Sequence, residues 1–276
     1  MSYIYRRRYT GPLQLAVFDW AGTLIDFGSL APLAAFLKVF EAEQISVSLA
    51  EARAPMGIEK RTHIATMLAE PGLAARWQAT KGAPVEESDI DRLFANFVPA
   101  QLEAIAEHAE LIPGVLDCVA ALRARGIKVG STSGYNGDMM AAVLPQAERQ
   151  GLRPDHVVCS SDVPKGRPSP AMALANAAAL SVDCVAACVK IDDTVAGIEE
   201  GLNAGFWTVG LAVSGNETGL SEADWQALSL ADQEAYRQGA TRRLLGAGAH
   251  YVIDSSAELL PIVDSIERRL AVGETP

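Results

Sequence analysis

Cysteine is scarce in this chain, which has only Cys118, Cys159, Cys184 and Cys188 among its 276 residues. Their spacing does not match that of a metal site, and the last three lie in strand-like apolar segments. A reduced cysteine in such a segment behaves as a small core residue. We therefore expect four reduced thiols, no disulfide framework and a cytoplasmic protein.

Long hydrophobic runs and an excess of positive charge are also missing. No apolar run reaches the roughly 18–20 residues that a membrane span needs. The opening "MSYIYRRRYTGP" has no apolar segment after its basic residues, so we expect a solvated arm there and not a secretory signal. The formal net charge of −11 argues against nucleic acid or an anionic membrane as a partner. A small anionic substrate is compatible with this charge, because a binding site needs only a few local cations.

One missing carboxylate carries chemical information. In "LAVFDWAGTLID", residues 15–26, a strand-like apolar run reaches Asp19 and then breaks into a Gly-Thr turn. This is how a nucleophilic aspartate is presented at the mouth of an α/β sheet. Phosphoryl transfer from an oxygen leaving group usually needs a second aspartate two residues later as its proton donor, but Ala21 stands there. The sequence therefore indicates a leaving group that needs no proton from an aspartate.

Short apolar runs alternate with helical patterns over most of the chain. Continuous apolar strands of this kind suit a parallel sheet covered on both faces, so we predict a doubly wound, Rossmann-like α/β fold. Strands are expected at 13–19, 127–132, 156–160, 185–192, 207–213 and 250–254, and helices at 114–125, 138–150, 169–180 and 194–204.

The interval from about 30 to 110 breaks this alternation, because it has helical periodicity and no convincing strand. "SLAE" at 48–51 has the form of a capping box at a helix start. We predict an all-helical cap domain, 28–107, inserted into an α/β core formed by 1–27 and 108–276. Such a cap would cover the carboxyl ends of the strands, where ligands bind in these folds. The polar region 214–249 is expected to form a loop and two helices.

Polar side chains follow the ends of four predicted strands. Asp19 and Asp193 are natural carboxylate ligands for Mg²⁺, with the backbone carbonyl of Ala21 as a third ligand. Ser133, with nearby amides such as that of Gly134, would bind phosphoryl oxygens. Arg167 offers a planar fork for the same group, whereas Lys165 reads more simply as a solvated loop lysine.

These motifs resemble the haloacid dehalogenase superfamily and, within it, the phosphonatase branch. The resemblance rests on "FDWAGT", "APMGIEKRTHI", "GSTSGY", "GRPSP" and "DDTVAGI", and the order of elements fits nearly the whole chain. It implies Mg²⁺-dependent cleavage of the C–P bond of phosphonoacetaldehyde to acetaldehyde and phosphate, in a homodimer. "DWAGT" together with "MGIEK" is specific to this branch.

The resemblance also assigns roles to residues. It implies that Lys60 forms an imine with the aldehyde, that Asp19 is the nucleophile and that Asp193 is a metal ligand. Arg167 and Ser133 would bind phosphate. The remaining residues that it places in the substrate pocket are Ser29, Met56, Gly57, His63, Gly134 and Tyr135.

Ala21 and Lys60 then both fit cleavage of a C–P bond in place of a phosphate ester. Breaking a C–P bond leaves an electron pair on carbon, and a protonated imine accepts that pair as an enamine. Lys60 must be neutral to form the imine, and burial with nearby cations would lower its pKa. His63, three residues on, would lie on the same helix face as a proton shuttle or, equally well, as a structural residue.

The chain departs from the family pattern at several positions. Asp192 and Gly197 stand where a glycine and an acidic residue are common, so a carboxylate of the metal's surroundings has moved in the sequence. Ser29 replaces a common cysteine, and Ser133 replaces threonine with its hydroxyl kept.

Three other functions remain open from the sequence. The first is a phosphatase or phosphomutase acting on a phosphate ester, which Ala21 disfavours. The second is an inactive binding protein, and the third is a C–P hydrolase for a larger β-carbonyl phosphonate.

Overall fold

A computed structural model describes residues 8–276, so most of the expected basic arm at the start lies outside the described part. The core is a six-stranded sheet with all neighbouring strands parallel, in the order β3-β2-β1-β4-β5-β6. Its strands are β1 Leu15–Phe18, β2 Lys128–Ser133, β3 His156–Cys159, β4 Cys188–Asp192, β5 Trp207–Leu211 and β6 Tyr251–Ile253. The predicted doubly wound α/β fold is confirmed, although Val185–Ala187 forms a 3₁₀ turn before β4.

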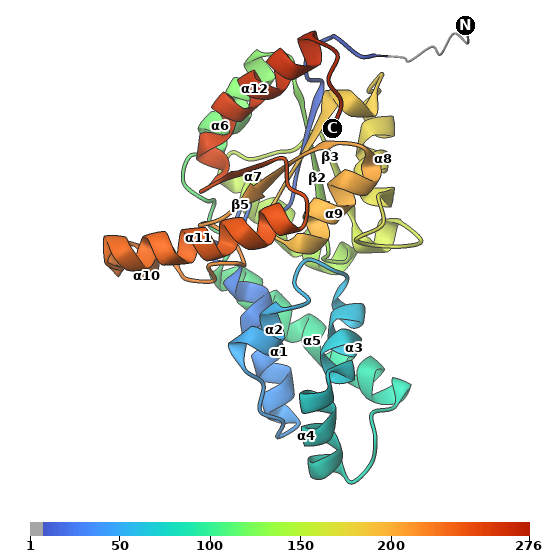
Figure 1. Ribbon diagram of the computed structural model, residues 1–276. Coiled ribbons are helices and arrows are strands. Elements are labelled where there is room, and N and C mark those ends of the chain that lie inside the picture. Colours follow the sequence, from blue (N-terminus) through green and yellow to red (C-terminus); the bar gives the residue numbers. More distant parts are fainter. Residues whose placement is uncertain (1–7) are drawn as a thin grey trace, which may run out of the picture.

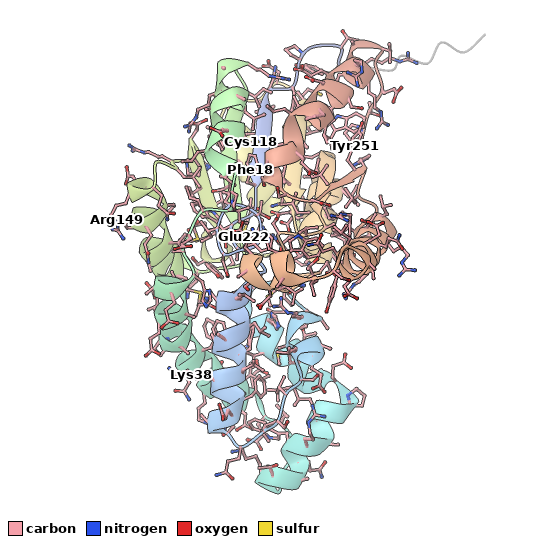
Figure 2. The ribbon with its side chains drawn as sticks, turned by 90° about the vertical axis from the view of Figure 1, so that its left-hand side faces the viewer. Phe18, Lys38, Cys118, Arg149, Glu222 and Tyr251 are labelled. Atoms are coloured by element: carbon pink, nitrogen blue, oxygen red, sulfur yellow. The ribbon has the colours of Figure 1, made fainter. Side chains whose placement is uncertain are left out.

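Helices cover both faces of this sheet (Figure 1). The alternating side chains of β1 show why: Ala16 and Phe18 belong to one hydrophobic cluster, and Leu15 and Val17 to another on the opposite face. Cys118 of α6 shares the cluster of Phe18, and Figure 2 labels both. The first face is covered by α6 Val115–Ala124, α7 Gly137–Arg149 and α12 Leu259–Ala271, and the second by α8 Ala171–Ala179, α9 Val195–Ala204 and α11 Leu230–Gly246.

Five helices between β1 and β2 form a separate group at one end of the sheet (Figure 1). They are α1 Leu30–Ala42, α2 Leu49–Arg53, α3 Lys60–Ala69, α4 Pro71–Lys81 and α5 Glu87–Glu107. We call this group the cap. The predicted capping box is present at the start of α2, where the Ser48 amide donates to Glu51 Oε2 at 2.8 Å. The domain limits 28–107 and 1–27 with 108–276 remain a prediction.

Two chain segments connect the cap to the core. Residues 24–29 lead into α1, and residues 108–113 return to the core. The two segments are joined by hydrogen bonds from Asp26 N to Glu110 O at 3.0 Å and from Ile112 N to Leu24 O at 2.9 Å.

The polar region after β5 forms a loop followed by α10 Glu222–Ala227 and α11, as predicted. The four cysteines are free, with Cys118, Cys159 and Cys188 buried and Cys184 partly buried. Among residues 8–276, no helix is both long and apolar enough to cross a membrane.

Candidate active site

A pocket of about 280 Å³ lies between the strand ends and the cap. All the predicted site residues line it except His63 and Asp193, and Pro32 and Thr194 join them. The residues in its wall are Asp19, Ala21, Ser29, Pro32, Met56, Gly57, Lys60, Ser133, Gly134, Tyr135, Arg167 and Thr194. Lys165 is exposed and does not line the pocket, in contrast to Arg167.

Asp19 follows β1 at the centre of the sheet and is buried. Its amide donates to Ile191 O at 3.0 Å, which extends the pairing of β1 with β4 by one residue. Its Oδ1 accepts a hydrogen bond from Arg167 Nη2 at 2.7 Å. Burial raises the pKa of Asp19 to about 6, against the opposing effect of the Arg167 guanidinium. Asp19 is thus held at the base of the pocket by the neighbouring strand and one cation.

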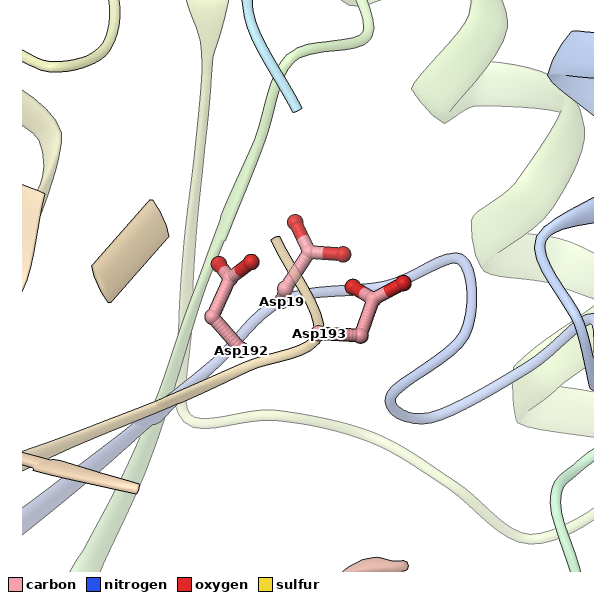
Figure 3. Close-up of side chains that lie close together, drawn as sticks. All are labelled: Asp19, Asp192 and Asp193. Atoms are coloured by element: carbon pink, nitrogen blue, oxygen red, sulfur yellow. The ribbon is translucent and has the colours of Figure 1, made fainter. Parts of the chain in front are cut away.

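Three carboxylates converge beside the pocket, from Asp19, Asp192 and Asp193. They can each offer an oxygen within 4.8 Å of the others, and Figure 3 shows the three side chains on the same side of the strand ends. Burial and the charges of Asp19 and Asp192 raise the pKa of Asp193 well above its ordinary value. Bringing hard oxygen donors and negative charge together in this way suits a divalent cation.

The net charge of the surrounding buried groups also supports a divalent cation site. Leaving Lys60 aside, this group contains four carboxylates and two cations. If all six are ionised, two negative charges remain uncompensated. These groups are Asp19, Asp192, Asp193 and Glu200 on one side and Arg167 and Lys190 on the other. A divalent cation would restore neutrality among these buried charges.

Lys190 and Glu200 were not singled out in the sequence, yet they hold Arg167 in place. Arg167 Nε donates to Glu200 Oε2 at 2.8 Å, and Lys190 Nζ lies 2.9 Å from Asp192 Oδ2. Thr132 Oγ1 links both cations, accepting from Lys190 at 2.7 Å and from Arg167 at 2.9 Å. All of these side chains are buried. The guanidinium is therefore oriented before any substrate arrives.

Lys60 enters the pocket from the cap. It is the first residue of α3, and its side chain is buried beside Met56 Sδ at 3.9 Å, with the rings of Tyr135 and Phe36 at 5.5 and 5.7 Å. Burial lowers the pKa of Lys60 to about 8, although Asp19 opposes this shift. A positive charge at a helix N-terminus is also disfavoured by the helix dipole. The surroundings therefore favour a neutral amine, as imine formation requires.

His63 lies one helical turn after Lys60 but outside the pocket wall. Its Nε2 is 2.9 Å from Ala52 O, and its ring lies 3.9 Å from that of Phe36 between centroids. Burial, with Lys60 nearby, lowers its pKa well below the ordinary value. In this arrangement His63 anchors the helix that carries Lys60 to α2, which is consistent with a structural role for this residue. Its role as a proton shuttle remains a prediction.

Glycines let the cap approach the core closely. A Cβ at Gly134 would lie 2.7 Å from Ile58 O and 2.9 Å from Gly57 O. Arg167 Nη1 donates to Gly57 O at 3.2 Å. Ser133, at the end of β2, accepts from the Tyr135 amide at 3.1 Å, so its hydroxyl proton is free to point into the pocket. The loop before Lys60 is thus in contact with the groups expected to bind phosphate.

The carboxylate of Asp192 fills the space next to Gly197. A Cβ at Gly197 would lie 1.9 Å from Asp192 Cγ, so no side chain fits at 197 while Asp192 is present. Asp192 and a side chain at 197 would therefore compete for one space, and we interpret the two departures from the family pattern as a single exchange of carboxylate position.

This exchange can be tested by reversing it. We expect Gly197→Asp alone to lower the free energy of unfolding by about 3 kcal/mol or more, because overpacking adds to charge repulsion. The double variant Asp192→Gly with Gly197→Asp should recover most of that loss. Urea unfolding would measure both. A double variant no more stable than Gly197→Asp would contradict the shared-space interpretation.

A family model described as haloacid dehalogenase-like hydrolase matches residues 13–205. The phosphonoacetaldehyde hydrolase of Hahella chejuensis is 51% identical over 276 residues, covering 100% of this chain and 94% of the relative. That of Paraburkholderia phytofirmans is 47% identical and covers 96% of this chain and 99% of the relative. A crystal structure of a phosphonoacetaldehyde hydrolase-like protein from Oleispira antarctica superposes with a TM-score of 0.98, at 49% identity and with full coverage of both chains.

Proposed function

The chain belongs to the haloacid dehalogenase-like hydrolases, and we propose that it hydrolyses the C–P bond of phosphonoacetaldehyde to acetaldehyde and phosphate. One observation carries the proposal: the buried amine of Lys60 and the buried carboxylate of Asp19 line the same small pocket, with Ala21 in place of a proton donor. The relatives that share about half of the sequence bear the name of this activity.

In the first stage the substrate is bound and activated. Arg167 and Ser133 hold the phosphonate oxygens at the strand ends, which places the aldehyde toward the cap. Neutral Lys60 Nζ attacks the aldehyde carbon, and loss of water gives a protonated imine. The apolar surroundings of Phe36 and Tyr135 keep bulk water away from it.

In the second stage the C–P bond breaks. A carboxylate oxygen of Asp19 attacks phosphorus, and the electron pair of the C–P bond moves into the imine to give an enamine on Lys60. Protonation of the enamine carbon and hydrolysis release acetaldehyde, and water cleaves the aspartyl-phosphate. No oxygen leaving group is formed, so no acid is needed at position 21 to protonate it. The phosphate-ester alternative lacks this proton donor and is not favoured.

We also propose Mg²⁺ as the cofactor, held by Asp19, Asp193 and the carbonyl of Ala21, with Asp192 beside them. When bound, the ion would neutralise charge shared by the carboxylates and the phosphonate. Thr23 Oγ1, at 3.4 Å, and the Asn216 amide, at 2.7 Å, donate to Asp193 and orient its carboxylate.

The reaction itself tests the proposal. Purified protein should release acetaldehyde from phosphonoacetaldehyde only when Mg²⁺ is supplied, and a coupled dehydrogenase that oxidises NADH would follow the release. Chelation should stop turnover and added Mg²⁺ should restore it. Folded, Mg²⁺-loaded protein that releases no acetaldehyde would reject the proposed substrate.

The pH dependence of imine formation follows from the surroundings of Lys60. Since burial lowers its pKa to about 8, the reactive neutral form increases as the pH rises through that value and levels off about one pH unit above it. Borohydride quenching with phosphonoacetaldehyde, followed by mass spectrometry of the Lys60 peptide, would record the profile. A lysine in a free peptide should keep gaining reactivity up to about pH 10.4. A Lys60 profile that coincides with the free peptide would contradict this prediction.

We further propose a cytoplasmic homodimer that acts on a small phosphonate and not on nucleic acid. Four free cysteines suit a reducing compartment. A mainly apolar hollow beside α2 and α3 includes Ala54, Pro55 and Met67, with Glu51 and Glu70 at its wall. Together with Leu49, exposed at 58%, it suits contact with a second cap.

A further inference from the structure

Arg53, the last residue of α2, reaches from the cap to the core. Its Nη1 donates to Gly28 O at 3.1 Å and to Asn216 Oδ1 at 3.0 Å, and its Nη2 donates to Gly219 O at 3.0 Å. One guanidinium thus joins the cap, the segment leading into the cap and the loop 214–219 that follows β5.

The loop held by Arg53 also holds the acidic site. The amide of Asn216 donates to Asp193 Oδ2 at 2.7 Å, and the Ser214 hydroxyl donates to Gly22 O at 2.9 Å, in the turn after Asp19. Gly219 has φ +67°, and a Cβ there would lie 2.6 Å from Arg53 Cζ. Both the conformation and the space at 219 therefore require glycine for this contact.

On its other side Arg53 is connected to the loop that carries Lys60. Its carbonyl accepts from the Met56 amide at 3.0 Å, and the chain then passes Gly57 before α3 begins at Lys60. Asp193, Asp26 and Glu217 surround the guanidinium with negative charge. Arg53 is thus linked through Asn216 to Asp193 of the core and through Met56 to the loop that precedes Lys60.

We propose that Arg53 is a positioning residue that holds the cap closed over the pocket, as a latch between α2 and the loop 214–219. Lys60 is then correctly placed and shielded from water only when this loop has the arrangement seen here. This rests on the proposed function for its catalytic consequence. Opening the cap would replace the hydrogen bonds of Arg53 with hydrogen bonds to water and would admit water to Lys60. Charge-assisted bonds of this kind are each worth about 1.5–3 kcal/mol, so losing one should lower the ratio of closed to open cap roughly 10- to 150-fold.

Hydrogen exchange of the wild type and of Arg53→Ala, without substrate, tests the latch independently of the chemistry. We expect amides of residues 54–60 to exchange at least about 10-fold faster in Arg53→Ala, with the rest of the core unchanged. The kcat/KM for phosphonoacetaldehyde should fall about 10- to 100-fold, mainly through KM, and the pH midpoint of Lys60 trapping should rise above about 8 as water enters. Arg53→Lys should show a partial effect, because it keeps the charge and loses the fork.

Two further variants make the test specific. Gly219→Ala disturbs the same contact from the core and should reproduce faster exchange at 54–60. Arg76→Ala is the matched control, since Arg76 pairs with Glu51 inside the cap and should leave exchange and turnover unchanged. Exchange at 54–60 that is the same in Arg53→Ala as in Arg76→Ala would overturn the latch. Faster exchange in a protein whose wild type shows no C–P cleavage would keep the latch and reject only the proposed function.

Discussion

Lys60→Met is expected to abolish acetaldehyde release, with a loss of at least about 1,000-fold, the scale on which removing a covalent nucleophile acts. Methionine lacks the amine that forms the imine, so the C–P electron pair has no acceptor. The fold should survive, because methionine fills a similar volume beside Met56, Phe36 and Tyr135. Thermal stability should equal or exceed that of the wild type, since a buried amine and its desolvation are removed. Acetaldehyde release and thermal unfolding would be measured on the same samples.

Two further variants distinguish the effect of losing the Lys60 amine from the effects of losing a positive charge or a cap lysine elsewhere. Lys60→Arg keeps a cation that cannot lose its proton and should be equally inactive. Lys81→Met removes another cap lysine that lies over an aromatic ring, that of Trp77 at 5.6 Å, and should keep full activity. Acetaldehyde release by either Lys60 variant above about one-hundredth of the wild-type rate would exclude the imine step.

Asp19→Asn is the second change with a large expected effect. The amide cannot attack phosphorus, so turnover should again fall by at least about 1,000-fold. The imine at Lys60 should still form, because the amine is kept and the lost Asp19 charge no longer opposes the lowered pKa of Lys60. Borohydride quenching with phosphonoacetaldehyde should therefore still label the Lys60 peptide in Asp19→Asn. The two variants thus stop the reaction on opposite sides of imine formation.

Asp26→Asn provides the matched control for Asp19→Asn. Asp26 is also a buried aspartate of the segment after β1, but it accepts the amides of Leu30 and Ala31 at 2.9 Å and does not line the pocket. We expect lower stability and turnover within about threefold of the wild type. Unlabelled Lys60 in folded Asp19→Asn would instead place Asp19 in imine formation.

Much of the core could be predicted because its strands are apolar on both faces, and parallel strands bring their carboxyl ends to one edge. Asp19, Ser133 and Asp193 come from three such ends, so their meeting follows from the fold. Lys60 is different. Nothing in its local pattern separates it from a surface helix lysine, and its place in the pocket could be anticipated only through the resemblance of the loop before it.

The residues that were missed have partners far away in the sequence. Arg53 contacts a loop 163 residues further on, and Glu200 lies on α9, where an acidic residue reads as a solvated helix face. Lys190 interrupts an otherwise apolar strand and gives no sign that its partners are Asp192 and Thr132. Their roles depend on which elements pack together, and periodicity and spacing do not contain that information.

The position of β1 has a consequence for biosynthesis. It lies at the centre of the sheet, between β2 and β4, yet the whole cap is translated before either neighbour exists. At about 5–20 residues per second, β1 waits roughly 5–20 s for β2. During that time its apolar segment is an unpaired strand edge on the nascent chain, while the helices of the cap can form from local contacts. The insertion that shields the pocket therefore makes completion of the sheet the slow and aggregation-prone part of folding.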